Sequence, residues 1–209
     1  MKKRILISPF IELNKYNKIV ISLNLEWFSY LNKLKLHPII ANPQISISNQ
    51  LNNINCIIIT GGGDIFKIKK KKENLFRDKF ETKLIKESIK KKIPIIAICR
   101  GFQLIHSLFD KNIKNLDKVK NHRNKNHFII FNKKNIFSNK SKIKVNSYHN
   151  IIIKKLNKEF EKIAHSDDQN IEIAYSKKNK IIGLMLHPER YNKDQNTINK
   201  IIKRFINFK

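Results

Sequence analysis

The chain has 209 residues, of which 44 are lysine or arginine and 16 are acidic, so its formal net charge at pH 7 is +28. With 41% hydrophobic residues, 5 glycines and 5 prolines, the composition excludes collagen-like and intrinsically disordered proteins. The two cysteines, Cys56 and Cys99, lie far apart, which excludes a disulfide framework and a cysteine-rich zinc site.

Short isoleucine-rich runs alternate with amphipathic segments, as expected of parallel strands that helices cover on both faces. The predicted strands are residues 5–8, 38–41, 56–60, 93–98, 128–131, 143–145, 171–175 and 181–186. The predicted helices are residues 25–34, 77–91, 102–109 and 197–207. Residues 110–137 look like a less regular, lysine-rich excursion. Because no repeat or linker interrupts the pattern, we expect one α/β domain spanning residues 1–209.

The positive charge by itself is weak support for a nucleic-acid-binding protein. Lysine, isoleucine and asparagine number 38, 39 and 27 and together make up 104 of the 209 residues, and A/T-rich codons encode all three. Lysine also outnumbers arginine by 38 to 6, whereas phosphate and base-edge recognition favour arginine. We therefore expect no nucleic-acid partner, and a basic nucleic-acid-binding domain with a vestigial site is the non-enzymatic alternative.

The sequence contains no recognisable export or membrane segment. The basic start is followed by an apolar run that ends at Ser8 and Pro9, which is too short for a signal peptide. No stretch approaches the roughly 18 apolar residues that a membrane span requires. We expect a cytoplasmic protein with no membrane partner.

A cluster of glycines follows one predicted strand. Residues 61–63 are all glycine and come directly after the strand predicted at residues 56–60. Glycine allows positive φ and close approach of the main chain, so this loop can present N–H groups to a developing negative charge. A plain tight turn explains the same residues, and a P-loop is excluded because no Gly-Lys-Ser/Thr follows.

A second turn contains the predicted nucleophile. A buried strand runs directly into Cys99 and Arg100, and a helix follows. This order of strand, sharp turn and helix is that of a nucleophile elbow, and the helix N-terminus favours a thiolate. We predict Cys99 as the nucleophile and Cys56, inside an isoleucine-rich strand, as a structural residue. The main-chain amides expected to form the oxyanion hole are those of Gly62, Gly63 and Arg100.

The predicted strand at residues 181–186 ends in His187-Pro188-Glu189. Pro188 fixes a turn that lets the Glu189 carboxylate reach back and orient the His187 imidazole. Together with Cys99, these residues complete a nucleophilic triad. The sequence therefore predicts Cys99, His187 and Glu189 as the catalytic residues.

These motifs resemble the class I glutamine amidotransferase superfamily and, within it, the γ-glutamyl-γ-aminobutyrate hydrolase type known as peptidase family C26. The segments that resemble the family, in family order, are Thr60-Gly61-Gly62-Gly63-Asp64, Arg77-Asp78-Lys79-Phe80-Glu81, Cys99-Arg100-Gly101-Phe102-Gln103, Val145-Asn146-Ser147-Tyr148-His149 and His187-Pro188-Glu189. The resemblance implies a flavodoxin-like three-layer sandwich with a mostly parallel central sheet and a nucleophile elbow. It also implies substrate-binding roles for Gln103, Asn146, Ser147 and His149.

Two departures from the family pattern concern the surroundings of the triad. The family usually has glycine two residues before the nucleophile, and this chain has Ala97. The usual paired histidines are replaced by Tyr148 and His149, and Asn150 stands where the family has glutamine. The second departure leaves the triad intact and alters the expected pocket for the leaving group.

The resemblance implies a cysteine-dependent hydrolase that cleaves a γ-glutamyl amide to glutamate and an amine. The segment of residues 9–26, between the first strand and the first helix, is longer than in typical glutaminase domains. This length favours a free-standing hydrolase. We expect residues 9–26 and 122–127 to contact the leaving group. Residues 23–27 resemble hydrolases encoded with surface-polysaccharide genes, some of which release a nucleotide amidate. The alternative is a glutaminase subunit that supplies ammonia to a separate synthetase.

We expect no cofactor and no metal. The histidines without a predicted catalytic role do not show recognised metal-ligand spacing, and they include His106, His122, His127, His149 and His165. The expected partner is a small γ-glutamyl substrate, and the sequence leaves a homodimer open.

Overall fold

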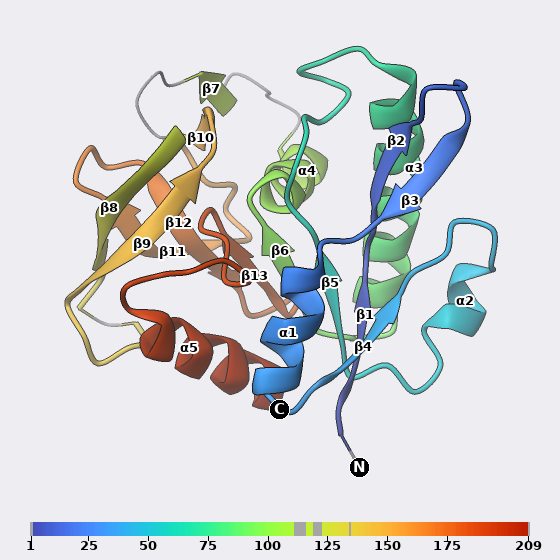
Figure 1. The fold of residues 1–209 in the computed structure, drawn as a ribbon. Helices are drawn as coiled ribbons and strands as arrows, with labels where there is room; N and C mark the ends of the chain where they lie inside the picture. Colours follow the sequence, from blue (N-terminus) through green and yellow to red (C-terminus); the bar gives the residue numbers. More distant parts are fainter. Residues whose placement is uncertain (1, 111–115, 119–122, 134, 209) are drawn as a thin grey trace.

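The structure is a computed structural model that describes residues 2–110, 116–118, 123–133 and 135–208. Its centre is a nine-stranded sheet in the order β4-β1-β5-β6-β13-β12-β11-β8-β9 (Figure 1). The first five strands in this order are parallel: β4 (His37–Ile40), β1 (Arg4–Ile7), β5 (Cys56–Ile59), β6 (Ile95–Ile98) and β13 (Ile181–Leu184). Antiparallel pairing adds the remaining four: β12 (Ile171–Ser176), β11 (Glu161–Ser166), β8 (Arg123–Phe131) and β9 (Lys142–Tyr148).

Helices cover both faces of the parallel half (Figure 1). One core cluster joins α1 (Leu25–Lys33) and α5 (Gln195–Asn207) to strand residues such as Ile5. The other joins α3 (Lys72–Lys90) and α4 (Arg100–Phe109) to strand residues such as Leu6. Because successive strand side chains point to opposite faces, each isoleucine-rich run supplies both cores. The predicted flavodoxin-like three-layer α/β fold is confirmed.

The predicted parallel strands and four main helices are all present, with shifted boundaries. The structure adds the short helix α2 (Ile47–Gln50), and α3 begins five residues earlier than the predicted residue 77. Within residues 9–26 it adds an antiparallel hairpin of β2 (Phe10–Leu13) and β3 (Ile19–Ser22). No helix in the described ranges is both long and apolar enough to span a bilayer.

The predicted strand at residues 128–131 is the second half of β8, which begins at residue 123, inside the predicted irregular excursion over residues 110–137, and pairs with β11 and β9. The first residues of β8 are polar, so they lack the apolar alternation that identifies a strand. The sequence also did not predict β11, because few of its residues are apolar. A small separate sheet pairs β7 (Leu116–Lys118) with β10 (Ile151–Ile153).

Two glycines let α4 pack very closely against the sheet. A Cβ on Gly101 would lie 2.4 Å from the Ile59 carbonyl oxygen, and a Cβ on Gly183 would lie 2.2 Å from the Phe102 ring. Both distances are too short for real atoms, so only glycine fits. This close packing fixes the start of α4, which follows Cys99, relative to β5 and β13.

We predict that Gly101→Ala destabilises the protein by about 2 kcal/mol, because its methyl group meets backbone that cannot rotate away. Urea unfolding of the purified chain measures this change. Leu108→Ala, a change at a 37% exposed position on the same helix, serves as the control, with an expected cost below about 1 kcal/mol. Equal costs for the two variants would contradict the close-packing argument.

Candidate active site

Cys99 occupies a sharp turn between β6 and α4. Its backbone has φ 48° and ψ −106°, outside the regions that a cysteine normally adopts, and it stands immediately before the first residue of α4. The Cys99 N–H donates to the Leu184 carbonyl at 2.6 Å, which ties the turn to the end of β13. A strained residue at the end of a buried strand and the start of a helix is the geometry of a nucleophile elbow.

His187 lies beside Cys99 and forms hydrogen bonds to both predicted partners. Its Nδ1 is 2.7 Å from Glu189 Oε1, and its ring also shares a hydrogen bond with the Cys99 side chain. Burial lowers the pKa of His187, but the hydrogen bonds to Cys99 and Glu189 and their charges outweigh burial and raise this pKa to about 9. The structure thus brings Cys99, His187 and Glu189 into one hydrogen-bonded chain.

Two asparagines hold the His187 backbone. Asn146 Oδ1 accepts from the His187 N–H at 2.8 Å, and Asn146 Nδ2 donates to the His187 carbonyl at 2.8 Å. Asn192 Nδ2 donates to the same carbonyl at 3.1 Å. Because these bonds fix both backbone groups of His187, its imidazole is held in place by β9 and by the chain after Glu189. The role of Asn192 could not be predicted from the sequence, because no motif surrounds this residue.

The glycine loop after β5 adopts the backbone that its composition predicts. Gly62 and Gly63 have φ values of +85° and +72°, which side chains other than glycine rarely adopt. Gly61 lies against His187 and Cys99, and a Cβ there would be 2.6 Å from His187 Cε1 and 3.3 Å from Cys99 Cβ. Glycine is therefore required at 61 for space and at the next two positions for conformation.

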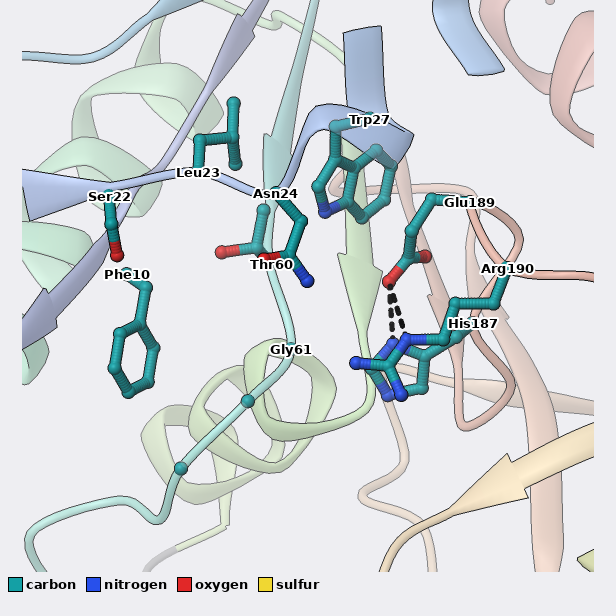
Figure 2. Close-up of a pocket in the computed structure, with 12 residues that line it drawn as sticks. Phe10, Ser22, Leu23, Asn24, Trp27, Thr60, Gly61, His187, Glu189 and Arg190 are labelled. Atoms are coloured by element: carbon teal, nitrogen blue, oxygen red, sulfur yellow. Dashed lines mark hydrogen bonds and ion pairs between the residues drawn. The ribbon is translucent and has the colours of Figure 1, made fainter. Parts of the chain in front are cut away.

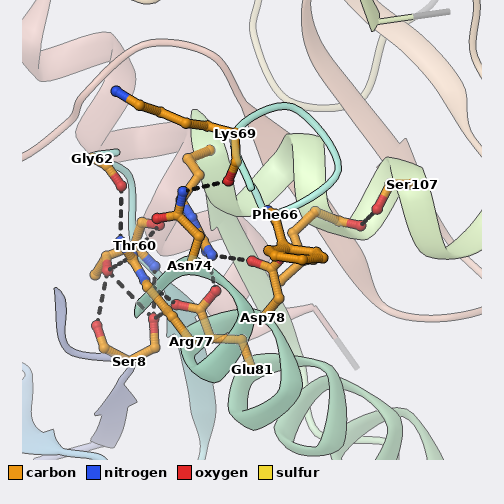
Figure 3. A network of polar contacts seen from close by, with 12 residues as sticks. Ser8, Thr60, Gly62, Phe66, Lys69, Asn74, Arg77, Asp78, Glu81 and Ser107 are labelled. Atoms are coloured by element: carbon orange, nitrogen blue, oxygen red, sulfur yellow. Dashed lines mark hydrogen bonds and ion pairs between the residues drawn. The ribbon is translucent and has the colours of Figure 1, made fainter. Parts of the chain in front are cut away.

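Arg77 of α3 binds the carbonyl side of this loop (Figure 3). Its guanidinium donates to the carbonyl oxygens of Gly62 at 2.8 Å and of Thr60 and Gly61 at 3.1 Å. The side chain is 2% exposed. With the carbonyl oxygens held by Arg77, the loop cannot rotate freely, and the orientation of its N–H groups is fixed with it.

Glu81 connects the glycine loop to the turn at Cys99. One of its oxygens accepts from Arg77 Nε at 2.9 Å and from Ser8 Oγ at 2.8 Å, and the other accepts from Arg100. Arg100 also pairs with Asp78. Burial raises the pKa of Glu81, but the charges of Arg100 and Arg77 outweigh it and hold this pKa below its ordinary value. Glu81 is therefore a buried carboxylate between two buried arginines.

A pocket of about 260 Å³ opens beside His187 (Figure 2). The hairpin β2–β3 and the start of α1 form one wall, and the glycine loop and the chain after β13 form the other. The residues that line it are Phe10, Ser22, Leu23, Asn24, Trp27, Thr60, Gly61, Gly62, Gly63, His187, Glu189 and Arg190. Residues 9–26 supply the Phe10 and Ser22–Asn24 part of the wall, and their contact with a leaving group stays a prediction.

Comparison with known proteins identifies the family. The model of the family described as Peptidase C26 matches residues 20–189, most of the chain. The chain belongs to the peptidase C26 family. The γ-glutamyl-CDP-amidate hydrolase of Campylobacter jejuni is 31% identical over 173 residues, which cover 81% of each chain.

Solved structures show that this family member shares the glutamine amidotransferase fold. A glutamine amidotransferase from Thermotoga maritima superimposes with a TM-score of 0.74 at 15% identity, covering 100% of both chains. The PurLQS structure from Thermotoga maritima gives a TM-score of 0.69 at 18% identity, with 99% of each chain covered. At these identities the likeness concerns the fold alone.

The four predicted substrate-binding residues of this C26 protein are all buried and lie outside the lining of the pocket. Gln103 Nε2 donates to the Ile151 carbonyl at 3.3 Å. Asn146 uses its side chain on the backbone of His187 and Tyr191, which is a positioning role. Ser147 is 1% exposed on β9, and His149 Nδ1 lies 3.2 Å from the Ile151 oxygen. Direct substrate contact by these residues stays a prediction.

His127 and His149 flank a second buried carboxylate, Glu172 of β12. His127 Nε2 lies 3.1 Å and His149 Nε2 3.6 Å from Glu172 Oε1. The side chain of His127 therefore faces Glu172 of the sheet, and a contact between residues 122–127 and the leaving group stays a prediction. His122 lies outside the described residues. No cluster of three or more histidine, cysteine or acidic side chains suited to a metal ion occurs within the described ranges.

We predict that Glu81→Gln destabilises the protein by about 3 kcal/mol near pH 7, because it leaves two buried arginines without their shared carboxylate. Urea unfolding at a series of pH values measures the loss. The pKa of Glu81 is lower in the folded protein than its ordinary value. Glu81 therefore contributes its full stabilisation at pH values above its ordinary pKa, and this stabilisation is lost as the pH falls through the pKa of the folded state. The difference in the free energy of unfolding between Glu81→Gln and wild type should therefore become smaller at acid pH.

Glu73→Gln, on the same helix, provides the matched control. Glu73 pairs with an exposed lysine, Lys71, at 3.5 Å, so its loss should change stability by less than about 1 kcal/mol. A similar small cost for Glu81→Gln would show that the buried network does not hold the two turns together.

Proposed function

We propose that this protein is a cysteine-dependent hydrolase that cleaves a γ-glutamyl amide into glutamate and an amine. The observation that carries the proposal is the hydrogen-bonded chain from Cys99 through His187 to Glu189 beside a positive-φ glycine loop. The family and the 31% identical γ-glutamyl-CDP-amidate hydrolase support the substrate class.

In the proposed first step, the Cys99 sulfur attacks the γ-carbonyl carbon. With its pKa raised to about 9, His187 is protonated at neutral pH and is a partner for the Cys99 thiolate. Electrons from the carbonyl bond move onto its oxygen, and we assign stabilisation of that charge to the amides of Gly62, Gly63 and Arg100. His187 then gives its proton to the leaving nitrogen as the carbon–nitrogen bond breaks.

The second step hydrolyses the glutamyl thioester. Neutral His187 takes a proton from water, and the resulting hydroxide attacks the same carbonyl carbon. Collapse of the intermediate releases glutamate and returns Cys99 to the thiolate. Glu189 keeps the imidazole oriented and stabilises its charged form without exchanging the proton itself. No bound cofactor enters this sequence.

The finer proposal concerns the amine. A pocket of about 260 Å³ beside His187 has more space than ammonia needs, which is compatible with a substituted amine as the leaving group. A γ-glutamyl nucleotide amidate fits the activity that the Campylobacter jejuni relative is named for. The alternative is a glutaminase subunit that feeds ammonia to a synthetase, and the shared fold of the Thermotoga maritima glutamine amidotransferase is compatible with it.

The proposal predicts that the purified chain releases glutamate from N-substituted γ-glutamyl amides without a synthetase and that glutamine is the poorer substrate. A coupled glutamate assay measures kcat/KM for each. Cys99→Ala should abolish release, whereas Cys56→Ala, at a buried core position, should retain turnover with reduced stability. Glutamine as the best substrate, with activity rising only when a synthetase is added, would favour the glutaminase alternative.

The pKa of His187 gives a separate prediction for the pH profile. Above about pH 9 the imidazole loses the proton that the leaving nitrogen needs, so kcat/KM should fall on the alkaline side. Glu189→Gln removes a negative partner that raises this pKa, and the alkaline limb should shift to lower pH with a reduced maximum. If the alkaline limb of the Glu189→Gln profile stayed at the same pH or moved to higher pH, His187 would not be the proton donor.

A further inference from the structure

Arg190 is the one arginine or lysine that lines the pocket beside His187 within the described ranges. The chain has 44 such residues, nearly all of them elsewhere on the molecule. In Figure 2 its guanidinium lies beside His187 and below the Glu189 carboxylate. Among the arginines and lysines of the described ranges, Arg190 alone therefore brings a permanent positive charge to this pocket, next to the group that would protonate a leaving nitrogen.

The ring of Tyr148 holds the guanidinium in place. The guanidinium carbon lies 4.3 Å from the centroid of Tyr148, a cation–π contact. Tyr148 in turn packs edge-on against His187, with the centroids 5.6 Å apart and the planes at 87°. Arg190 is thus held beside the reactive histidine by an aromatic ring and is not a freely moving surface side chain.

Two carboxylates lie near Arg190, and they leave its guanidinium able to bind a further anion. Its Nε is 3.9 Å from Glu26 and 3.9 Å from Glu189, and both distances exceed a normal hydrogen bond. The Nε is also buried without a hydrogen-bond partner among the described residues. Glu189 is bound to His187, and Glu26 is 55% exposed, so water screens its charge. An anion that reached the guanidinium would gain charge-assisted hydrogen bonds.

Another part of the pocket lining is apolar and aromatic. Phe10, Leu23 and Trp27 line it, and the Phe10 ring is held over the buried Arg77 guanidinium at 5.1 Å. Flat apolar surfaces of this kind suit the ring of an aromatic or heterocyclic amine. In the same pocket, Arg190 suits a phosphate or another anionic group.

We propose that Arg190 is a specificity-determining residue that binds an anionic group, of the phosphate kind, on the departing amine. The inference rests on the proposed hydrolysis, because it assigns the pocket to the leaving group of that reaction. The ring of the amine lies against Phe10 and Trp27, and its anionic group lies on Arg190. The enzyme then selects γ-glutamyl amides whose leaving group carries both features.

Binding tests this assignment independently of turnover. Trp27 is the sole tryptophan of the chain and lines the pocket, so its fluorescence reports occupancy directly. Phenyl phosphate should change the Trp27 emission of the wild-type protein, and Arg190→Met should weaken its binding at least tenfold. Arg190→Lys keeps the charge but loses the planar guanidinium that stacks on Tyr148, so its affinity for phenyl phosphate should lie between those of wild type and Arg190→Met. Arg204→Met, on an exposed position of α5, controls for the lost net charge and should match wild type.

Turnover of a matched substrate pair completes the test. The two substrates are the γ-glutamyl amides of 4-aminophenyl phosphate and of 4-methylaniline. Arg190→Met should raise KM for the phosphate substrate about tenfold with kcat within twofold, and should leave the methylanilide within twofold. The proposal would be overturned if Arg190→Met impaired turnover of both substrates equally, or if it left the affinity for phenyl phosphate unchanged. Binding that requires Arg190 in a protein that cleaves no γ-glutamyl amide would support the anion site and overturn the proposed hydrolysis.

Discussion

The active site depends on one buried carboxylate, Glu81, shared between two arginines. Arg77 uses it to reach the carbonyl oxygens of the glycine loop, and Arg100 uses it to anchor the turn that presents Cys99. These two turns follow β5 and β6, which are neighbouring parallel strands. Without a common ionic partner they would be separate loops, and the amides proposed for the oxyanion hole would have no fixed relation to the sulfur.

His187 reaches the same place from the seam of the sheet. It follows β13, where the parallel half meets the antiparallel half, and its backbone is held by Asn146 of β9. Each half of the sheet therefore helps to position the chain of Cys99, His187 and Glu189. The pKa of His187 is raised to about 9 by Cys99 and Glu189. This raised pKa depends on the fold, because Cys99 comes from a different segment of the chain than His187 and Glu189.

The sequence predicted what local patterns determine and missed what distant contacts determine. The isoleucine-rich strands, the positive φ of Gly62 and Gly63, and the turn at Cys99 all follow from residues adjacent in the chain. β11, whose apolar residues are few, owes its pairing to its neighbours in the sheet. Arg190 was likewise missed, because only the fold brings it against Tyr148 and beside a pocket lined by the hairpin.

The hairpin of β2 and β3 forms a two-stranded sheet of its own, outside the nine-stranded one. It lines the pocket through Phe10 and Ser22 yet contributes no hydrogen bond to the central ladder. Its tip can therefore lengthen, shorten or change composition while the strands that carry Cys99 and His187 keep their register. In evolutionary terms the hairpin is a module through which a lineage can change the lining of this pocket while the strands that carry Cys99 and His187 are inherited unchanged.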